Sequence, residues 1–221
     1  MRAIKALTLE EYQSLTRDAL VLSRDEHGDK VLQTPQGMII KLFRRKRLIS
    51  SALLRPYAVR FVNASRRLRE LGIPSVQVQS VLRVPALTRH LVIYPRLDGI
   101  TLRQAVLVIG RRDVLLEKLA RFLAMLHGKG VYFRAMHFGN VLVMNDGNLA
   151  LIDISETRFR SGRLSADLRT RNFRPLTSYP EDLQALRDFG MERFLETYHA
   201  AADLNPAQRA RFDHALQRVL W

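Results

Sequence analysis

The sequence predicts an α+β fold in two parts, with strands gathered in the N-terminal part and long helices in the C-terminal part. Three runs rich in Val, Ile and Leu lie within residues 19–43 and are separated by turn signals that contain Gly or Pro. After Asp98 and Gly99 the pattern changes to one dominated by long helices. We therefore expect a strand-rich lobe over residues 1–96 and a reduced, mainly helical lobe over residues 97–221.

The N-terminal lobe should contain an antiparallel five-stranded sheet and two helices. A capping box at Thr8-Leu9-Glu10-Glu11 predicts a short helix that runs to about Asp18. An amphipathic helix is expected over residues 56–71, because Gly72 and Pro74 form a typical helix stop. The expected strands cover residues 19–24, 30–34, 38–43, 76–83 and 90–94.

The C-terminal lobe is predicted from helical spacing and from one hairpin. Leucine and phenylalanine recur at core-facing positions over residues 113–127, which indicates an amphipathic helix. Two apolar runs flank Asn145-Asp146-Gly147, a pattern typical of a β-hairpin. Two further helices are expected over residues 180–202 and 206–220.

The composition is that of an ordinary folded protein with an unusual charge. The 221 residues include 36 Lys and Arg against 21 Asp and Glu, and the net charge of +15 favours polyanionic partners such as nucleic acid, anionic membrane or a phosphorylated glycolipid. No cysteine occurs, which excludes disulfides and thiolate chemistry. We expect neither a signal peptide nor a membrane span, because no stretch has the ~18 apolar residues that a span needs.

The segment from Phe133 to Ser155 carries the strongest motif. It reads Phe-Arg-Ala-Met-His-Phe-Gly-Asn, then an apolar run, a turn and Leu-Ile-Asp-Ile-Ser. Asn140 and Asp153 lie 13 residues apart, as a short hairpin between two loops requires. Earlier, Lys41 ends the apolar run Ile39-Ile40. Each residue also has an ordinary interpretation: a solvated lysine, a capping asparagine and an aspartate that closes a strand.

Together these segments resemble the phosphate-binding lysine, the catalytic loop and the metal-binding loop of protein kinases. Over residues 19–200 the chain resembles small bacterial proteins of the lipopolysaccharide kinase family (Kdo/WaaP-like), including toluene-tolerance-type members. The resemblance implies a protein-kinase-like two-lobe fold with ATP and Mg²⁺ as cofactors. Lys41 would bind phosphates, Tyr94 and Asn140 would contact the nucleotide, and Asn140 and Asp153 would hold magnesium.

The catalytic loop departs from the kinase pattern at its most important position. Ala135 lies five residues before Asn140, where kinases have the aspartate that accepts the substrate's proton. Alanine cannot accept a proton. The resemblance assigns Arg134 and His137 to shaping the loop, but His137 is also the titratable side chain nearest to the missing base. The position of Ala135 therefore leaves turnover an open question.

Two further departures weaken the predicted nucleotide site. Asn63 occupies the expected position of the glutamate that pairs with Lys41, and it could hydrogen-bond the lysine without neutralising it. Only Gly28 lies between the first two strands, so no G-x-G-x-x-G loop is present. In addition, Ile154-Ser155 replaces Phe-Gly after Asp153, which is a milder change.

Three functions remain open from the sequence. The first is ATP-dependent phosphoryl transfer to a sugar hydroxyl of the lipopolysaccharide core. The second is a pseudokinase, a binding or scaffold module for core-assembly enzymes without turnover. The third is non-specific nucleic-acid binding through Arg66, Arg67 and Arg69; no specific nucleic-acid partner is expected, because no recognised module is present.

The expected partner and location follow from the family resemblance and the charge. Six arginines between residues 158 and 174 could bind the lipopolysaccharide core or another anionic glycolipid, or they could form a solvated basic loop. We expect a cytoplasmic protein that also lies peripherally on the inner membrane through contact with anionic lipid.

Overall fold

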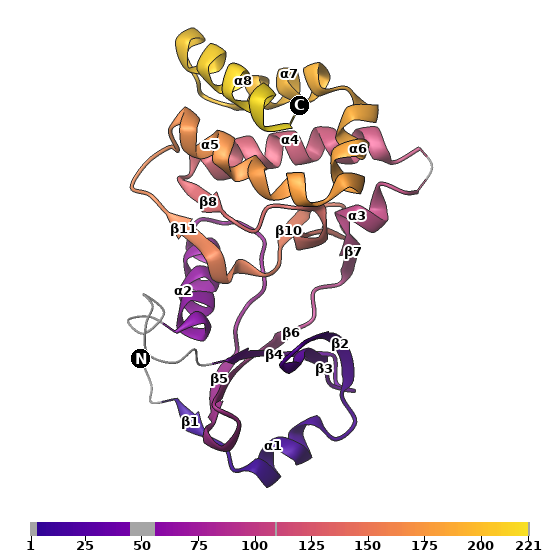
Figure 1. The fold of residues 1–221 in the computed structure, drawn as a ribbon, viewed down its shortest axis with the longest axis vertical. Helices are drawn as coiled ribbons and strands as arrows, with labels where there is room; N and C mark the ends of the chain where they lie inside the picture. The colour runs from indigo at the N-terminus through magenta and orange to yellow at the C-terminus, as the bar shows by residue number, and fades with distance from the viewer. Residues whose placement is uncertain (1–3, 45–55, 109, 221) are drawn as a thin grey trace. The chain divides into compact units, whose positions relative to one another are not determined.

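The structure, a computed structural model, describes residues 4–44, 56–108 and 110–220. It divides into an N-terminal unit, Met1–Glu70 with Ser75–Leu97, and a C-terminal unit, Leu71–Pro74 with Asp98–Trp221. The first unit is rich in strands and the second in helices (Figure 1), which confirms the predicted α+β class. None of the described helices combines the length and apolar character needed to cross a bilayer.

The N-terminal unit is built on one six-stranded sheet with the order β1-β5-β6-β4-β3-β2. The five predicted strands are β2 to β6, and each is antiparallel to its neighbours among them. β1 is a two-residue addition that runs parallel to β5. The strands are β1 (Lys5–Ala6), β2 (Leu20–Asp25), β3 (Gly28–Gln33), β4 (Met38–Arg44), β5 (Ser80–Val84) and β6 (Arg89–Pro95).

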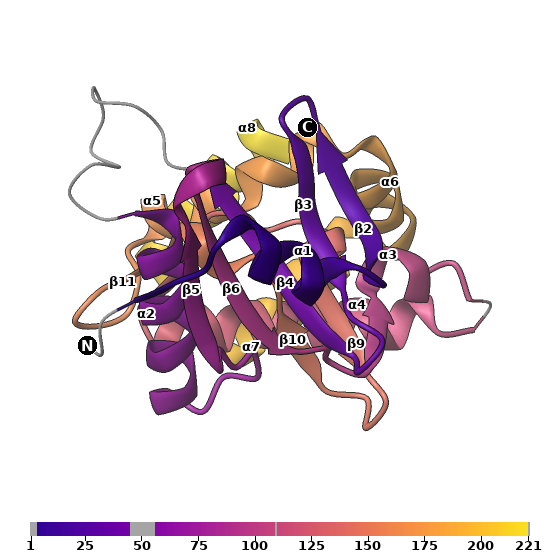
Figure 2. The same cartoon turned by 90° about the horizontal axis from the view of Figure 1, so that it is seen from below.

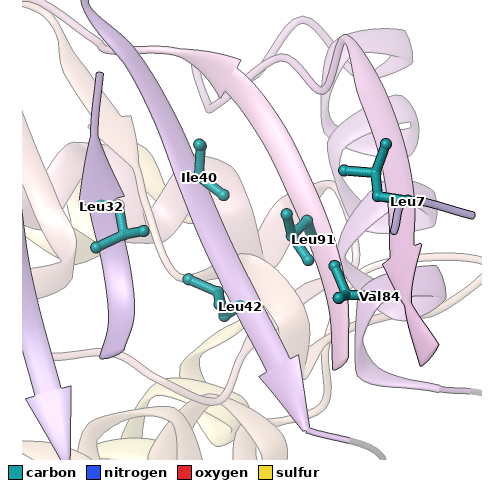
Figure 3. Packing of buried hydrophobic residues seen from close by; sticks show 6 residues of the cluster. All are labelled: Leu7, Leu32, Ile40, Leu42, Val84 and Leu91. Atoms are coloured by element: carbon teal, nitrogen blue, oxygen red, sulfur yellow. The ribbon is translucent and has the colours of Figure 1, made fainter. Parts of the chain in front are cut away.

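One face of this sheet carries an apolar core covered by α1 (Leu9–Thr16), which lies across the strands in Figure 2. The predicted capping box is present: Thr8 Oγ1 accepts a bond from the Glu11 backbone N–H, and the Glu11 carboxylate accepts one from the Thr8 N–H. Tyr12 of α1 packs against the cluster. The buried cluster in Figure 3 consists of Leu7, Leu32, Ile40, Leu42, Val84 and Leu91.

The opposite face of the sheet receives α2 (Tyr57–Glu70) through Phe61, which contacts Phe43 and Tyr94. The segment after α2 is tied to the helix by Ser65, whose hydroxyl donates to Val76 O at 2.7 Å and accepts from the Val78 N–H at 3.2 Å. Residues 76–78 therefore bond to α2, and β5 begins at Ser80 instead of at residue 76, where the sequence placed it. A short helix, η1 (Pro85–Leu87), joins β5 to β6.

The helices of the C-terminal unit gather around α4 (Arg112–Gly128), which buries the predicted stripe of leucines and Phe122. The helix predicted over residues 180–202 is broken at Gly190, whose φ of 97° cannot continue a helix. The sequence did not predict α3 and α5. The remaining helices are α3 (Leu102–Ala105), α5 (Ala166–Phe173), α6 (Pro180–Phe189), α7 (Met191–Ala201), α8 (Pro206–Leu220) and the short η4 (Arg174–Ser178).

Two small sheets of the C-terminal unit frame the predicted catalytic loop. β9 (Val141–Met144) and β10 (Leu149–Leu151) form the predicted hairpin, and β7 (Gly99–Thr101) pairs with the other edge of β9. β8 (Val131–Phe133) pairs with β11 (Thr157–Phe159). The short helices η2 (Phe138–Asn140) and η3 (Ile154–Glu156) precede β9 and β11, so the predicted loop residues lie at the ends of these strands.

Candidate functional site

Lys41 lies on the face of the N-terminal sheet opposite the apolar cluster. It pairs with Val31 on one side and Val92 on the other, so the three side chains share one face. The side chain is buried, and its Nζ lies 5.8 Å from the ring centroid of Phe43 and 5.6 Å from that of Phe61. The ammonium is therefore held against aromatic rings, unlike that of an ordinary surface lysine.

From α2, Phe61 lies against Lys41. Asn63 is half-buried and lies two residues further along α2, about 200° around the helix axis from Phe61. Phe61 is therefore the residue of α2 whose ring lies against the ammonium, with the centroid 5.6 Å from Nζ. The role of Asn63 as a hydrogen-bond partner of Lys41 stays a prediction.

A row of residues beside Lys41 extends this face across four strands. Ile39 lies two residues before Lys41 in β4, so both side chains point to the same face of the sheet. The other residues of the row are paired with Ile39, or with each other, across neighbouring strands and share that face. Tyr94 is buried and stacks on Phe61 at 5.5 Å, whereas Leu20 is 63% exposed. Such an apolar, partly open surface suits a flat ring such as a nucleotide base. The row consists of Leu20, Gln33, Ile39 and Tyr94.

The turn between β2 and β3 is short and is held by a distant arginine. Asp25 and Gly28 are partners at the end of the two strands, and Gly28 has a φ of 101°, which favours glycine. The Arg89 guanidinium donates to the backbone oxygens of His27 and Asp29. The turn is therefore short, and Arg89 fixes its backbone. It contains one glycine, whereas the loop that closes around phosphates in kinases contains several.

In the C-terminal unit, Asn140 closes the predicted catalytic loop. Its side-chain Nδ2 donates to the backbone oxygen of Ala135 at 2.9 Å, and its backbone N–H donates to His137 O at 2.9 Å. The amide nitrogen is thus committed to the loop, and Oδ1 is the atom left to act as a ligand. Ala135 is held in place by Asn140 although it has no side chain for proton transfer.

Asp153 lies next to Asn140 at the end of the hairpin. The Ile152 N–H donates to Asn140 O at 3.0 Å, which extends the β9–β10 pairing to the residue before Asp153. Asp153 has a φ of 50°, an uncommon conformation for a residue other than glycine, and strained residues of this kind cluster at functional sites. Its Oδ1 accepts a long bond of 3.4 Å from Ser155 Oγ.

The chemistry of this pair fits magnesium. Mg²⁺ is usually bound by one or two carboxylates or other oxygen ligands together with substrate phosphates. Asn140 and Asp153 supply one amide oxygen and one carboxylate. The described residues contain no group of three or more His, Asp or Glu side chains that could bind a metal by themselves.

His137 is held by contacts that favour the loop-shaping role. Its ring stacks on that of Tyr179 with centroids 4.1 Å apart, and its Nδ1 accepts the Gly139 N–H at 3.2 Å. Burial, followed by the positive charge of Arg103, lowers the pKa of His137 below its ordinary value. The neutral ring then carries its proton on Nε2, so neither nitrogen has a lone pair available to accept a substrate proton.

Arg134 links the catalytic loop to the segment after Asp153. Its Nη1 lies 2.8 Å from Glu156 Oε2, and both side chains are partly exposed. The pairing of β11 with β8 holds the same two segments together, with Thr157 opposite Phe133. The loop is therefore fixed on both sides of Ala135 by residues of the C-terminal unit.

Three further residues support this loop and were missed from the sequence: Arg103, Tyr179 and Asp182. The buried Asp182 carboxylate accepts two bonds from Arg103, at 2.8 and 3.0 Å, and one from the Phe138 N–H at 2.7 Å. The Arg103 guanidinium lies 4.5 Å from the centroid of the Tyr179 ring that stacks on His137. No local pattern marks Asp182, although the capping box at Thr101 and Gln104 could have predicted α3, which carries Arg103.

The arginine series after Asp153 does not form a single surface. Arg169 is fully buried, with its Nε donating to Leu164 O at 2.9 Å and its Nη1 to the Tyr198 hydroxyl at 2.7 Å. The idea that every member meets a substrate or solvent is therefore wrong for Arg169. Arg163 forms an exposed ion pair with Asp203. The other four members, Arg158, Arg160, Arg171 and Arg174, are exposed.

The structure thus assembles part of the predicted site within each unit. Lys41, Asn63 and Tyr94 belong to the N-terminal unit. The catalytic-loop residues and Asp153 belong to the C-terminal unit, where Asn140 and Asp153 are brought together. That both groups bind one nucleotide stays a prediction.

Comparison with known proteins identifies the fold and no family. No protein-family model and no curated protein matches the chain. Its structure is similar to that of a solved protein described as a divergent kinase that lacks the glycine-rich loop and regulates membrane ultrastructure of the Toxoplasma parasitophorous vacuole. The TM-score is 0.53 at 15% identity, over 98% of this chain and 86% of that chain. The chain therefore has the predicted protein-kinase-like fold, and the likeness shows the fold alone.

Proposed function

We propose that this chain binds ATP with magnesium and serves lipopolysaccharide core assembly, by phosphoryl transfer to a sugar hydroxyl. The observation that carries the proposal is the bond from the Ile152 N–H to Asn140 O, which sets Asp153 one residue beyond the partner of Asn140, with the amide nitrogen of Asn140 bonded into the loop. The Asn140 amide oxygen and the Asp153 carboxylate are the kinds of ligand that magnesium prefers, and they match the metal-binding pair of the kinase pattern in the sequence. When bound, magnesium would neutralise the charge of the phosphates.

Lys41 has the properties of a phosphate-binding lysine. A buried ammonium against two aromatic rings is poorly hydrated, so a phosphate oxygen that reaches it gains a strong charge-assisted bond. The row from Leu20 to Tyr94 on the same face offers the apolar surface that a base needs. The structurally similar divergent kinase is also described as lacking the glycine-rich loop.

Transfer in this chain would proceed without a side-chain base. Ala135 cannot take a proton, and the Nδ1 lone pair of His137 already accepts the Gly139 N–H. General-base catalysis contributes about 10²–10⁴-fold in rate, so we expect turnover slower than that of a complete kinase by about this factor. The acceptor class follows from the family resemblance and from the four exposed arginines past Asp153, which suit an anionic glycolipid.

A second function, a pseudokinase that binds nucleotide or core-assembly enzymes without turnover, is favoured by two observations. Ala135 removes the base, and the α2 position expected to carry the glutamate that orients the lysine holds Asn63 instead. Under this alternative the Asn140–Asp153 pair binds a ligand that is never converted. The two functions share the nucleotide site and differ only in turnover.

Thermal unfolding with ATP, with and without Mg²⁺, tests the shared site. We expect Mg-ATP to raise the Tm of the wild-type chain, and Asp153→Ala and Asn140→Ala to remove the magnesium-dependent part of the shift. Asp188→Ala is the matched control, because Asp188 is an exposed carboxylate of the same unit in an ordinary ion pair. No stabilisation of the wild type at millimolar Mg-ATP would overturn both functions.

Transfer of labelled γ-phosphate to isolated core oligosaccharide then separates the two functions. Incorporation that Asp153→Ala abolishes and Asp188→Ala preserves supports the phosphotransferase. Nucleotide binding without any incorporation supports the pseudokinase.

A further inference from the structure

The exposed apolar side chains of the C-terminal unit gather in one place. In the part of this unit that the structure describes, large apolar side chains are exposed at four positions: Ile100, Leu107, Val108 and Val114. Ile100 belongs to β7, Leu107 and Val108 follow α3, and Val114 lies in the first turn of α4. Leu107 is the most exposed, at 79%. We call these four residues the apolar patch.

Two adjoining hollows connect the residues of the apolar patch. Ile100, Val108 and Val114 line a hollow of about 550 Å³, together with residues of the β9–β10 turn. Leu107 and Val108 line a second hollow of about 520 Å³. Val108 lines both, so the patch is a continuous surface and not a set of scattered side chains. Contiguous apolar surface of this kind marks interaction sites in soluble proteins.

The rim of the apolar patch is cationic. Arg111 and Lys118 line the larger hollow, are exposed, and form no ion pair with any residue that the structure describes. The carboxylate of Asp113, at the smaller hollow, is bound by Arg193 at 2.7 Å. One exposed carboxylate, that of Asp146, lies on the rim. Lys118 Nζ also donates to Gly147 O at 3.1 Å, next to Asp146 in the same turn, so the rim holds two cations and one carboxylate and has a net positive charge.

We propose that the apolar patch inserts into the surface of an anionic lipid bilayer, with Arg111 and Lys118 among the head groups. Apolar side chains flanked by Lys and Arg are the composition that binds such interfaces, where anionic lipid attracts each nearby cation. The exposure of Leu107 favours a bilayer, because lipid surrounds a protruding side chain, whereas a peptide in the hollow would cover one side of it. The net charge of +15 adds a general attraction to the same surface.

This inference is independent of nucleotide binding, and vesicle sedimentation of the full chain tests it. We expect binding to vesicles of phosphatidylcholine mixed with phosphatidylglycerol and little binding to phosphatidylcholine alone. The double variant Leu107→Ser, Val108→Ser should weaken binding by at least about tenfold, because two apolar side chains no longer leave water. The control Leu9→Ser, Leu15→Ser changes two exposed leucines of α1 and should leave binding unchanged.

Charge and insertion depth are tested separately. Arg111→Gln with Lys118→Gln should weaken binding about tenfold, and more than the charge-matched control Arg17→Gln with Arg218→Gln. Trp221 is the only tryptophan of the chain, so Leu107→Trp in a Trp221→Phe background reports on one position. Its emission should shift to shorter wavelength with anionic vesicles and be quenched by brominated lipid.

Three results would overturn the proposal. The first is no binding to anionic vesicles at low salt. The second is binding that the Leu107→Ser, Val108→Ser variant leaves unchanged, which would assign the contact to another basic surface. The third is a lipid-free dimer, seen by sedimentation velocity, that the same variant dissociates, since the patch would then be an interface between two copies of the chain.

Discussion

Arg103 and Asp182, 79 residues apart in the chain, form a bidentate ion pair that contacts the backbone of the candidate catalytic loop. The second oxygen of Asp182 also accepts the Phe138 N–H at 2.7 Å, so one buried carboxylate joins α3, α6 and the loop. Its hydrogen bond to Asp182 raises the pKa of Arg103 above the ordinary value. Loop geometry in this chain therefore depends on a residue remote from the motif.

Asp182→Ala should destabilise the fold strongly. Removing the buried carboxylate takes the acceptor from the Phe138 N–H and leaves Arg103, which is 30% exposed, with only Glu181 at 3.3 Å, a combined loss that should cost more than about 2 kcal/mol. The free energy of unfolding from urea titration measures the effect. Asp188→Ala breaks the exposed pair with Arg112 and should cost less than about 1 kcal/mol. Similar costs for the two variants would contradict the supporting role of Asp182.

A second buried network makes stability depend on pH. The ring of His127 is fully buried between the Tyr198 hydroxyl, 2.8 Å from Nδ1, and Asn172 Oδ1, 3.2 Å from Nε2. Asn172 in turn bonds both the N–H and the C=O of Phe133, the last residue before Arg134. Burial is the largest cause that lowers the pKa of His127 to about 3, and burial likewise raises the pKa of Tyr198 to about 12.

Stability should therefore fall as the pH falls from about 6.5 towards about 3. In this range the unfolded chain binds a proton at His127 that the folded chain excludes, so the free energy of unfolding decreases by up to about 1.4 kcal/mol per pH unit. Urea titrations across this range measure the slope. His127→Gln, which can both donate and accept, should be less stable at neutral pH and should flatten the slope. An unchanged slope in this variant would assign the acid sensitivity to other groups.

Gly130 should be intolerant of a side chain. It has a φ of 72°, and a Cβ at this position would lie 2.3 Å from Gly162 O and 2.6 Å from Arg160 O, both of which are backbone atoms. Gly130→Ala should therefore cost at least about 2 kcal/mol and loosen the pairing of β8 with β11. Gly128→Ala is the control, because a Cβ there meets nothing within 4 Å. Equal stability of the two variants would contradict the tight approach of these segments.

The sequence predicted the parts of the fold that depend on local pattern. The stripe of α4, the capping box of α1 and the hairpin at Asn145-Asp146-Gly147 each need only neighbouring residues to be recognised. α5 escaped prediction because a buried arginine, Arg169, occupies a core position that sequence patterns assign to apolar residues. The short strands β7 and β11 are only three residues long and carry no pattern of their own.

The candidate site was predictable to a similar extent. Asn140 and Asp153 flank the predicted hairpin, which the structure contains, and their joint role as ligands stays a prediction. The surroundings of each residue depend on tertiary contacts. Lys41 lies against the ring of Phe61, His137 stacks on Tyr179, and the Phe138 N–H donates to Asp182. The two partners in each contact come from elements far apart in the chain, so no spacing rule could have identified them.

Restoring the missing base tests the proposed transfer reaction directly. The backbone of residue 135 is held by Asn140 Nδ2, and the side chain is only half-buried, so an aspartate can be accommodated without disturbing the loop. Ala135→Asp should raise phosphate incorporation into core oligosaccharide by up to about 10²–10⁴-fold, and Ala135→Asn, which has the same shape without a base, should not. Both variants should keep the wild-type Mg-ATP stabilisation. If Ala135→Asp binds nucleotide normally but gains no turnover over Ala135→Asn, the missing base is not what limits the reaction, and the pseudokinase becomes the better description.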